Sequence, residues 1–194
     1  LPYGIYNESE AVVKNANISS QYGIYNKNDA NIEIDNSTIT SGTYGILNLG
    51  EMSLDGSTIN LSLYGIDNKG VLDIDNTTLI KAVKTSSSTI TYGIYNESSG
   101  EITGENNIIN SYSADEPITY AIYNEGEGTL ENTEILNATY GFQNTNTGNI
   151  EIKGGEITNT NLGLFNIGTI KVDSIETNTK TYSIQTVSNS ITEI

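Results

Sequence analysis

The chain of 194 residues contains no cysteine, histidine or tryptophan, and its eight basic residues are all lysine. These absences exclude a thiolate nucleophile, an imidazole general base, a Cys or His metal site and an arginine clamp on a phosphate or carboxylate. With 24 Asp and Glu, the formal net charge is −16. Nucleic acids and anionic lipids are bound chiefly through Lys and Arg, so we expect no nucleic-acid partner. No apolar run approaches the ~20 residues of a membrane span, so we expect no membrane insertion of this segment.

What the chain does contain is typical of β-structure and turns. Asn, Thr, Ile and Ser dominate, 13 of the 15 aromatic residues are Tyr, and only two residues are Pro. Hydrophobic residues make up 36% and charged residues 16%, which is compatible with a folded body. The length favours one domain over 1–194. The chain begins without Met and shows no signal peptide, so we expect an internal segment of a longer protein.

A five-residue segment, Tyr-Gly-Ile-Tyr-Asn in its fullest form, recurs along the chain in steps of 19 to 28 residues. Its nine copies, the last of them decayed, begin at Tyr3, Tyr22, Tyr44, Tyr64, Tyr92, Tyr120, Tyr140, Leu162 and Tyr182. Most repeats also contain an apolar residue followed two places later by Asn or Gly, the residues that accept positive φ. These pairs predict one left-handed turn residue per repeat, in the order Val13/Asn15, Ile34/Asn36, Leu54/Gly56, Ile74/Asn76, Ile102/Gly104, Leu130/Asn132 and Ile152/Gly154.

Short strands that recur at this period cannot bury an apolar face alone, so neighbouring repeats must stack. We therefore predict an all-β fold, a right-handed parallel β-helix (β-solenoid) of about nine coils. A three-sided left-handed solenoid is disfavoured because the coils are long and uneven. Simple alternation would place Tyr3, Ile5 and Asn7 inward and Gly4 and Tyr6 outward. At the inner bend, stacked amides are expected to form a structural ladder of Asn7, Asn26, Asn48, Asn68, Asn96, Asn124, Asn144 and Asn166.

The recurring Tyr-Gly-Ile-x-Asn segments resemble those of the right-handed parallel β-helix in the pectin-lyase-like superfamily, as found in repetitive bacterial surface proteins and adhesins. The resemblance covers Tyr3 to about Ile175 and implies an extracellular protein, on the bacterial surface or secreted. That superfamily also contains polysaccharide lyases and hydrolases, so the fold alone does not decide function. Its enzymes use an Arg, Lys or His beside acidic residues. Here Arg and His are absent and the lysines share no column with an acidic cage, so we expect no catalytic residue.

One column of acidic residues is a candidate metal site. Asp35, Asp55 and Asp75 follow the second apolar position in three successive coils and are expected to stack roughly 5 Å apart. Carboxylates this close favour a cation, and Ca²⁺ takes oxygen ligands. The alternative is that each Asp serves the adjacent turn at a solvated edge. No cofactor other than a structural Ca²⁺ is indicated.

Two surface features are candidate binding sites. An outward aromatic column beside the Gly column is expected to form a glycine-floored groove with flat faces for sugars or a partner protein, built from Tyr6, Tyr25, Tyr95 and Tyr123. Insertions of about eight residues lengthen two neighbouring coils at 80–91 and 109–119 and should protrude side by side. Their candidate binding residues are Lys81, Lys84, Tyr112, Asp115 and Glu116. The alternatives are rings that merely cover the backbone glycines and neutral variation in tolerant loops.

These observations favour a non-catalytic segment of a bacterial surface protein, an adhesin or stalk that presents a binding surface to a host or neighbouring-cell protein or carbohydrate. Two alternatives stay open at the level of sequence. One is a Ca²⁺-dependent polysaccharide lyase or hydrolase of the same superfamily, and the other is a structural spacer without a ligand.

Overall fold

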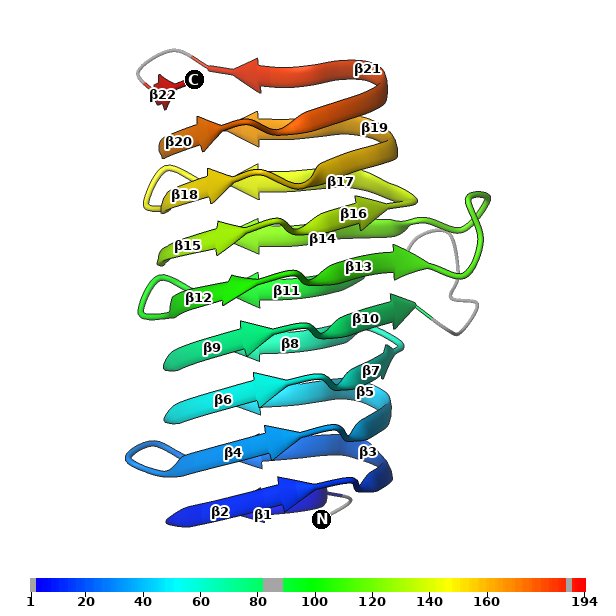
Figure 1. Cartoon of the computed structure of the whole chain (residues 1–194), viewed down its shortest axis with the longest axis vertical. Coiled ribbons are helices and arrows are strands. Elements are labelled where there is room, and N and C mark those ends of the chain that lie inside the picture. The colour runs from blue at the N-terminus through cyan, green and yellow to red at the C-terminus, as the bar shows by residue number, and fades with distance from the viewer. Residues whose placement is uncertain (1–2, 82–88, 188–189) are drawn as a thin grey trace.

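The structure is a computed structural model that describes residues 3–81, 89–187 and 190–194. In these residues it is a parallel β-solenoid of about nine turns, with strands and no helix, so the predicted fold class is confirmed. The coils stack into a rod with β1 at one end and β21 and β22 at the other (Figure 1). Each turn of the chain therefore advances the rod by one strand spacing, roughly 4.8 Å.

The strands form two parallel sheets. One face of the rod is a nine-stranded sheet of β2 (Glu10–Lys14), β4 (Asn31–Asp35), β6 (Glu51–Asp55), β9 (Val71–Asp75), β12 (Glu101–Glu105), β15 (Glu127–Glu131), β18 (Asn149–Lys153), β20 (Thr169–Asp173) and β22 (Ile191–Glu193). A 13-stranded sheet folds around the rest of the rod. One leg of it contains β7 (Thr58–Leu61), β10 (Thr78–Lys81), β13 (Ile108–Ser111) and β16 (Glu134–Leu136). The other leg contains β1 (Tyr3–Asn7), β8 (Tyr64–Asn68), β11 (Tyr92–Asn96), β14 (Ile118–Asn124) and β17 (Ala138–Asn144). Four long strands run through both legs, namely β3 (Asn17–Asn26), β5 (Thr38–Asn48), β19 (Glu156–Asn166) and β21 (Glu176–Thr186).

The register places equivalent repeat positions directly above one another. In the pairing of β5 with β8, Tyr44 lies opposite Tyr64, Ile46 opposite Ile66, and Asn48 opposite Asn68. Inside the rod, the stacked Ile and Leu side chains form one continuous core with almost no exposed surface. A single coil contributes only a thin layer to this core, so each coil depends on its neighbours for burial.

The asparagine column forms a hydrogen-bonded ladder through the interior. From Asn7 to Asn166, each side-chain amide donates to the Oδ1 of the next Asn at 2.8 Å. The same Nδ2 groups also donate to main-chain carbonyls of the adjacent turn, as Asn48 does to Gly50 at 3.2 Å and to Val71 at 3.0 Å. Because the turn's carbonyls are buried with the amides, the ladder satisfies polar groups that water cannot reach.

The predicted left-handed turn residues are found at six of seven positions. Positive φ occurs at Asn15, Asn36, Gly56, Asn76, Asn132 and Gly154. The prediction of Gly104 is wrong, because Gly104 lies inside β12 opposite Ile74 and Asn106, with φ 55°, takes the left-handed place. In this coil glycine stands at an inward position where the preceding coil has isoleucine, which displaces the apparent alignment by two residues. Consequently Glu105, not Thr103, lies beside Asp75.

Simple alternation fails at the glycine of the repeat. In the interior coils both Gly45 and Ile46 are buried, whereas Tyr44 is half-buried on the outside. A Cβ added to Gly45 would lie 2.4 Å from the Gly65 carbonyl oxygen and 2.6 Å from Ile59 Cγ2, so the glycines pack against the core of the opposite leg. The chain bends there, and the Tyr column faces outward together with the column that begins at Tyr6. The predicted glycine-floored groove beside the aromatic column is therefore wrong.

Candidate functional site

The most extensive surface feature is an aromatic ridge along the leg of β1, β8, β11, β14 and β17. We define it by the tyrosines that are in ring contact there, namely Tyr3, Tyr6, Tyr22, Tyr25, Tyr44, Tyr64, Tyr92, Tyr95, Tyr120, Tyr123 and Tyr140. From Tyr22 to Tyr140, successive rings of the first column are 4.6 to 5.8 Å apart and within 21° of parallel. The four residues predicted from the second column, Tyr6, Tyr25, Tyr95 and Tyr123, all lie on this ridge.

The ridge presents ring edges rather than the flat faces that the sequence suggested. Because each ring of the first column stacks on the next, neighbouring rings cover its faces and leave its edge outward. Tyr6 and Tyr25 stack in the same way, at 5.1 Å and 5°. Two rings are exceptions: Tyr3 is tilted by 46° to Tyr22, and Tyr123 stands at 84° to Tyr95 and at 74° to Tyr120. The stacking itself stabilises the contact between coils, by about 0.5–1.5 kcal/mol per aromatic pair.

Asp67 interrupts the second column of the ridge between Leu47 and Tyr95. Only 5% of Asp67 is exposed, and its Oδ1 has no hydrogen-bond partner among the described residues. Burial and the neighbouring carboxylate of Glu97 raise the pKa of Asp67 to about 7, against the opposing effect of Lys69. An ionisable group so perturbed is unusual on an otherwise repetitive scaffold, and such groups gather at functional sites.

The groups around Asp67 form a small polar cluster beside the ridge. Lys69 Nζ lies 3.0 Å from Glu97 Oε1, and this contact raises the pKa of Lys69. The charge of the neighbouring Glu97 carboxylate also acts on Asp67 and raises its pKa. One coil further on, burial and the charge and hydrogen bond of Glu125 raise the pKa of the Tyr95 phenol. The sequence analysis missed this cluster; its one signal is an aspartate in a column otherwise filled by Tyr, Leu, Gln and Phe.

The insertion loop predicted at 109–119 is shorter than expected, whereas residues 82–88 of the loop predicted at 80–91 lie outside the described residues. Strand β13 continues to Ser111 and β14 begins at Ile118, so residues 109–111 and 118–119 are strand and the loop is 112–117 (Figure 1). Lys81 is buried at the end of β10, where its Nζ donates to the carbonyls of Glu116 at 3.4 Å and Pro117 at 3.2 Å. Burial lowers the pKa of Lys81, and the Glu116 carboxylate opposes that effect. Lys81 therefore anchors the loop rather than facing a partner.

The other candidate binding residues of the two loops differ in their exposure. Tyr112 and Asp115 are exposed on the loop, and Glu116 is half-buried. Lys84 lies outside the described residues.

The acidic column lies on the outer face of the nine-stranded sheet. Asp35, Asp55 and Asp75 are in register there, and the column continues through Glu105 and Glu131. Asp55 accepts a hydrogen bond from Asn76 at 2.9 Å, and Asp75 accepts one from the Glu105 amide at 2.9 Å. Burial first, and then the nearby charges, raise the pKa of Asp75. In the described part of the chain no three acidic side chains converge as metal ligands.

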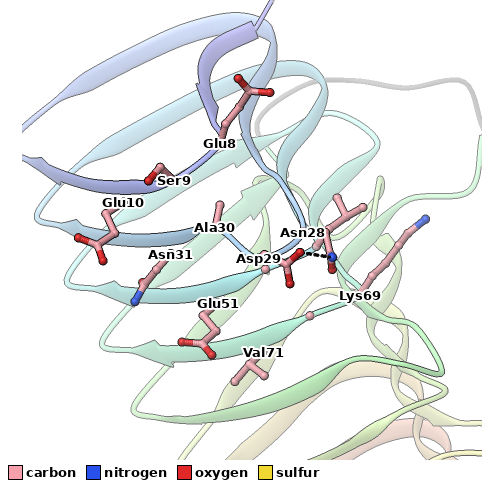
Figure 2. Close-up of a pocket in the computed structure, with 13 residues that line it drawn as sticks. Glu8, Ser9, Glu10, Asn28, Asp29, Ala30, Asn31, Glu51, Lys69 and Val71 are labelled. Atoms are coloured by element: carbon pink, nitrogen blue, oxygen red, sulfur yellow. Dashed lines mark hydrogen bonds between the residues drawn. The ribbon is translucent and has the colours of Figure 1, made fainter.

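An open hollow of about 700 Å³ lies over the turns that follow the asparagine ladder in the first coils. Glu8, Glu10, Asp29 and Glu51 line it, with Lys69 at one side (Figure 2). Figure 2 shows these carboxylates spread along the hollow rather than directed at one point. Asp29 is engaged by Asn28, whose Nδ2 donates to it at 3.0 Å. The hollow therefore lacks a convergent set of ligands.

Comparison with known proteins adds no relative. No protein-family model matches the chain, and no curated protein or solved structure matches it significantly. Across the described residues there is no helix with the length and apolar character needed to cross a bilayer. Functional interpretation therefore rests on the geometry of the ridge, the Asp67 cluster and the loop.

Proposed function

We propose that this chain is a non-catalytic, surface-exposed segment of a bacterial adhesin or stalk, and that its aromatic ridge is the binding surface. The single observation that carries the proposal is the gathering of 11 of the 13 tyrosines into one continuous ridge on one leg of the rod. The parallel solenoid fold supports it at the level of architecture, through the resemblance to repetitive bacterial surface proteins. That support is analogy, since a fold by itself carries no function.

The chemistry of the ridge suits recognition. Tyrosine is enriched in protein interfaces because a rigid ring supplies contact area at low entropic cost while its hydroxyl supplies a hydrogen bond. Here the stacked rings are already ordered, so a partner loses little to side-chain ordering when it binds. A row of ring edges and phenol groups suits the hydroxyls of a carbohydrate or the polar rim of a protein. Because the formal net charge of the chain is −16, an uncharged or cationic partner is favoured over an anionic one.

The test is a screen of the folded chain against a glycan array and against host-cell surface proteins, repeated with ridge variants. The variants are Tyr95→Leu and Tyr123→Gln, because Leu47 and Gln143 occupy the same column in other coils and the fold accepts them. We expect the double variant to lose at least about tenfold in affinity. The matched control is Glu101→Gln on the outer face of the nine-stranded sheet, which should bind normally. Unchanged binding by the double variant would refute the ridge as the binding surface.

The loop 112–117 is a second contact zone to be tested separately. It protrudes from the corner between β13 and β14, and Tyr112 is 51% exposed on it. Replacing 112–117 with a short turn should reduce binding if the partner spans both ridge and loop. Full binding without the loop would confine the contact to the ridge.

Two alternatives have distinct experimental signatures. A structural spacer is favoured by the covered ring faces and the self-satisfied amide ladder; it predicts failure of every screen with the correctly folded chain. A Ca²⁺-dependent polysaccharide lyase or hydrolase predicts unsaturated products or new reducing ends from acidic polysaccharides, lost in Asp55→Ala. Against a hydrolase at the Asp67 cluster, Asp67 is only 5% exposed and the Glu97 carboxylate is already paired with Lys69 at 3.0 Å, which leaves no open pair of carboxyls for a substrate.

A further inference from the structure

We propose that Asp67 keeps its proton at the base of the aromatic ridge, and that losing this proton opens the ridge at that coil. The consequence for partner binding rests on the proposed function, but the opening itself does not. The ridge would thus carry a built-in pH-sensitive element at the one place where its second column contains a carboxyl group.

The position of Asp67 makes water scarce around its carboxyl. The titratable groups that interact with it or lie opposite it come from three successive coils, namely Tyr44 from β5, Tyr64 and Lys69 from β8 and its turn, and Tyr95 and Glu97 from β11 and its turn. Lys69 is the only cation in that set. It is already held by Glu97 at 3.0 Å, so a second carboxylate would have no cation of its own.

The proton is placed on Asp67 by its surroundings. Glu97 is paired with Lys69 at 3.0 Å, whereas Asp67 is buried and its Oδ1 has no partner among the described residues. A neutral acid tolerates one unpartnered carbonyl oxygen at modest cost, but an ionised carboxylate in the same place does not.

Ionisation of Asp67 must therefore bring water to its carboxylate, and the ring contacts indicate the route. Tyr64 and Tyr95 meet beside Asp67 at 6.4 Å between ring centroids, the widest ring contact in the ridge. Separation of these two rings would hydrate Asp67 and break the continuity of the ridge. A partner lying across the ridge would exclude that water, so binding and proton uptake should favour each other.

The experiment needs no ligand, because the chain contains 13 tyrosines and no tryptophan. Near-ultraviolet circular dichroism and tyrosine emission therefore report directly on the ridge. Between about pH 5.5 and about pH 8.5, the native chain should show one single-proton transition with a midpoint near pH 7. Asp67→Asn should abolish the transition. The control Asp55→Asn removes the same charge at an exposed position and should keep it.

A second variant tests the proposal even if Asp67→Asn does not fold. Glu97→Gln removes the negative charge that raises the pKa of Asp67 and frees Lys69 from its ion pair, so the midpoint should fall by at least about one pH unit. The inference is overturned if the native chain shows no transition, if the transition survives in Asp67→Asn, or if Glu97→Gln leaves the midpoint unchanged. A clear transition combined with failure of every binding screen would instead remove the proposed function and leave the buried proton on Asp67 in place.

Discussion

Replacing Asn48 by alanine removes one rung of the asparagine ladder, and the contacts of that rung determine the expected loss of stability. Its Nδ2 donates to Asn68 Oδ1 at 2.8 Å, to the Gly50 carbonyl at 3.2 Å and to the Val71 carbonyl at 3.0 Å, and its Oδ1 accepts from Asn26 at 2.8 Å. The side chain has no exposed surface. Because Nδ2 carries two hydrogens, its three contacts amount to two donated hydrogen bonds. The substitution therefore removes three hydrogen bonds at once, two donated and one accepted, and leaves Asn68 Oδ1 without a donor.

Each lost hydrogen bond costs about 1 kcal/mol, and a buried acceptor left without a donor adds about 1–3 kcal/mol. We therefore expect Asn48→Ala to lower the free energy of unfolding by about 4–6 kcal/mol. That is a large part of the 5–15 kcal/mol typical of a folded domain. For a chain of this size the melting temperature should fall by roughly 10–20 °C.

The assay is denaturant and thermal unfolding followed by far-ultraviolet circular dichroism and tyrosine emission. The matched control is Asn60→Ala in the same coil, because Asn60 makes one hydrogen bond, to Thr40 Oγ1 at 3.2 Å, in an exposed setting. Its cost should stay within about 0.5 kcal/mol. Equal losses in Asn48→Ala and Asn60→Ala would refute the reasoning that buried ladder amides hold the coils together.

Three further predictions concern other parts of the rod. Asp67 has a folded pKa raised from 3.8 to about 7, so the folded state keeps a proton that the unfolded chain has lost, and stability falls as pH rises from about 4 to about 7. In urea titrations Asp67→Asn should match the native chain near pH 4 and exceed its unfolding free energy by up to about 4 kcal/mol above pH 7; a constant difference across that range would contradict this. Gly45→Ala should destabilise by about 1–3 kcal/mol in the same titrations, because the added Cβ meets the Gly65 carbonyl and Ile59; a neutral result would show that the coils can move apart locally. Lys81→Met should speed hydrogen exchange in 112–117, because two hydrogen bonds that anchor this loop are lost, and unchanged exchange would show that the loop is held by other contacts.

The repeat is the reason that so much of the fold was predictable. Nine copies of one segment at a period of 19 to 28 residues leave few structures other than a stacked solenoid, and the asparagine column has to be satisfied inside it. The prediction of turn residues failed where a glycine inside a strand has the same spacing from an apolar residue as a turn residue has. Gly104 follows Ile102 as a turn residue would, yet it lies within β12, because only the pairing with the preceding coil defines its register.

The orientation of the tyrosines was the second failure, and its cause is also tertiary. Alternation predicts that Tyr44 and Ile46 share a face, but Gly45 and Ile46 are both buried, and Gly45 lies too close to the next coil to carry a side chain there. Whether Lys81 faces a partner or the chain itself likewise depends on where the Pro117 carbonyl lies, and these residues are far apart in sequence.

By itself, the sequence determined the class of this protein, its coil count, its core columns and the chemistry it lacks, because these follow from residue types that recur at a regular period. Only the tertiary structure decided how the side chains of different coils meet. Stacking turned the tyrosine rings edge-outward, and the closure of coils around Asp67 converted an ordinary surface aspartate into a buried acid beside Glu97. Burial and the separation of charges are properties of neighbouring coils, and no single repeat contains them.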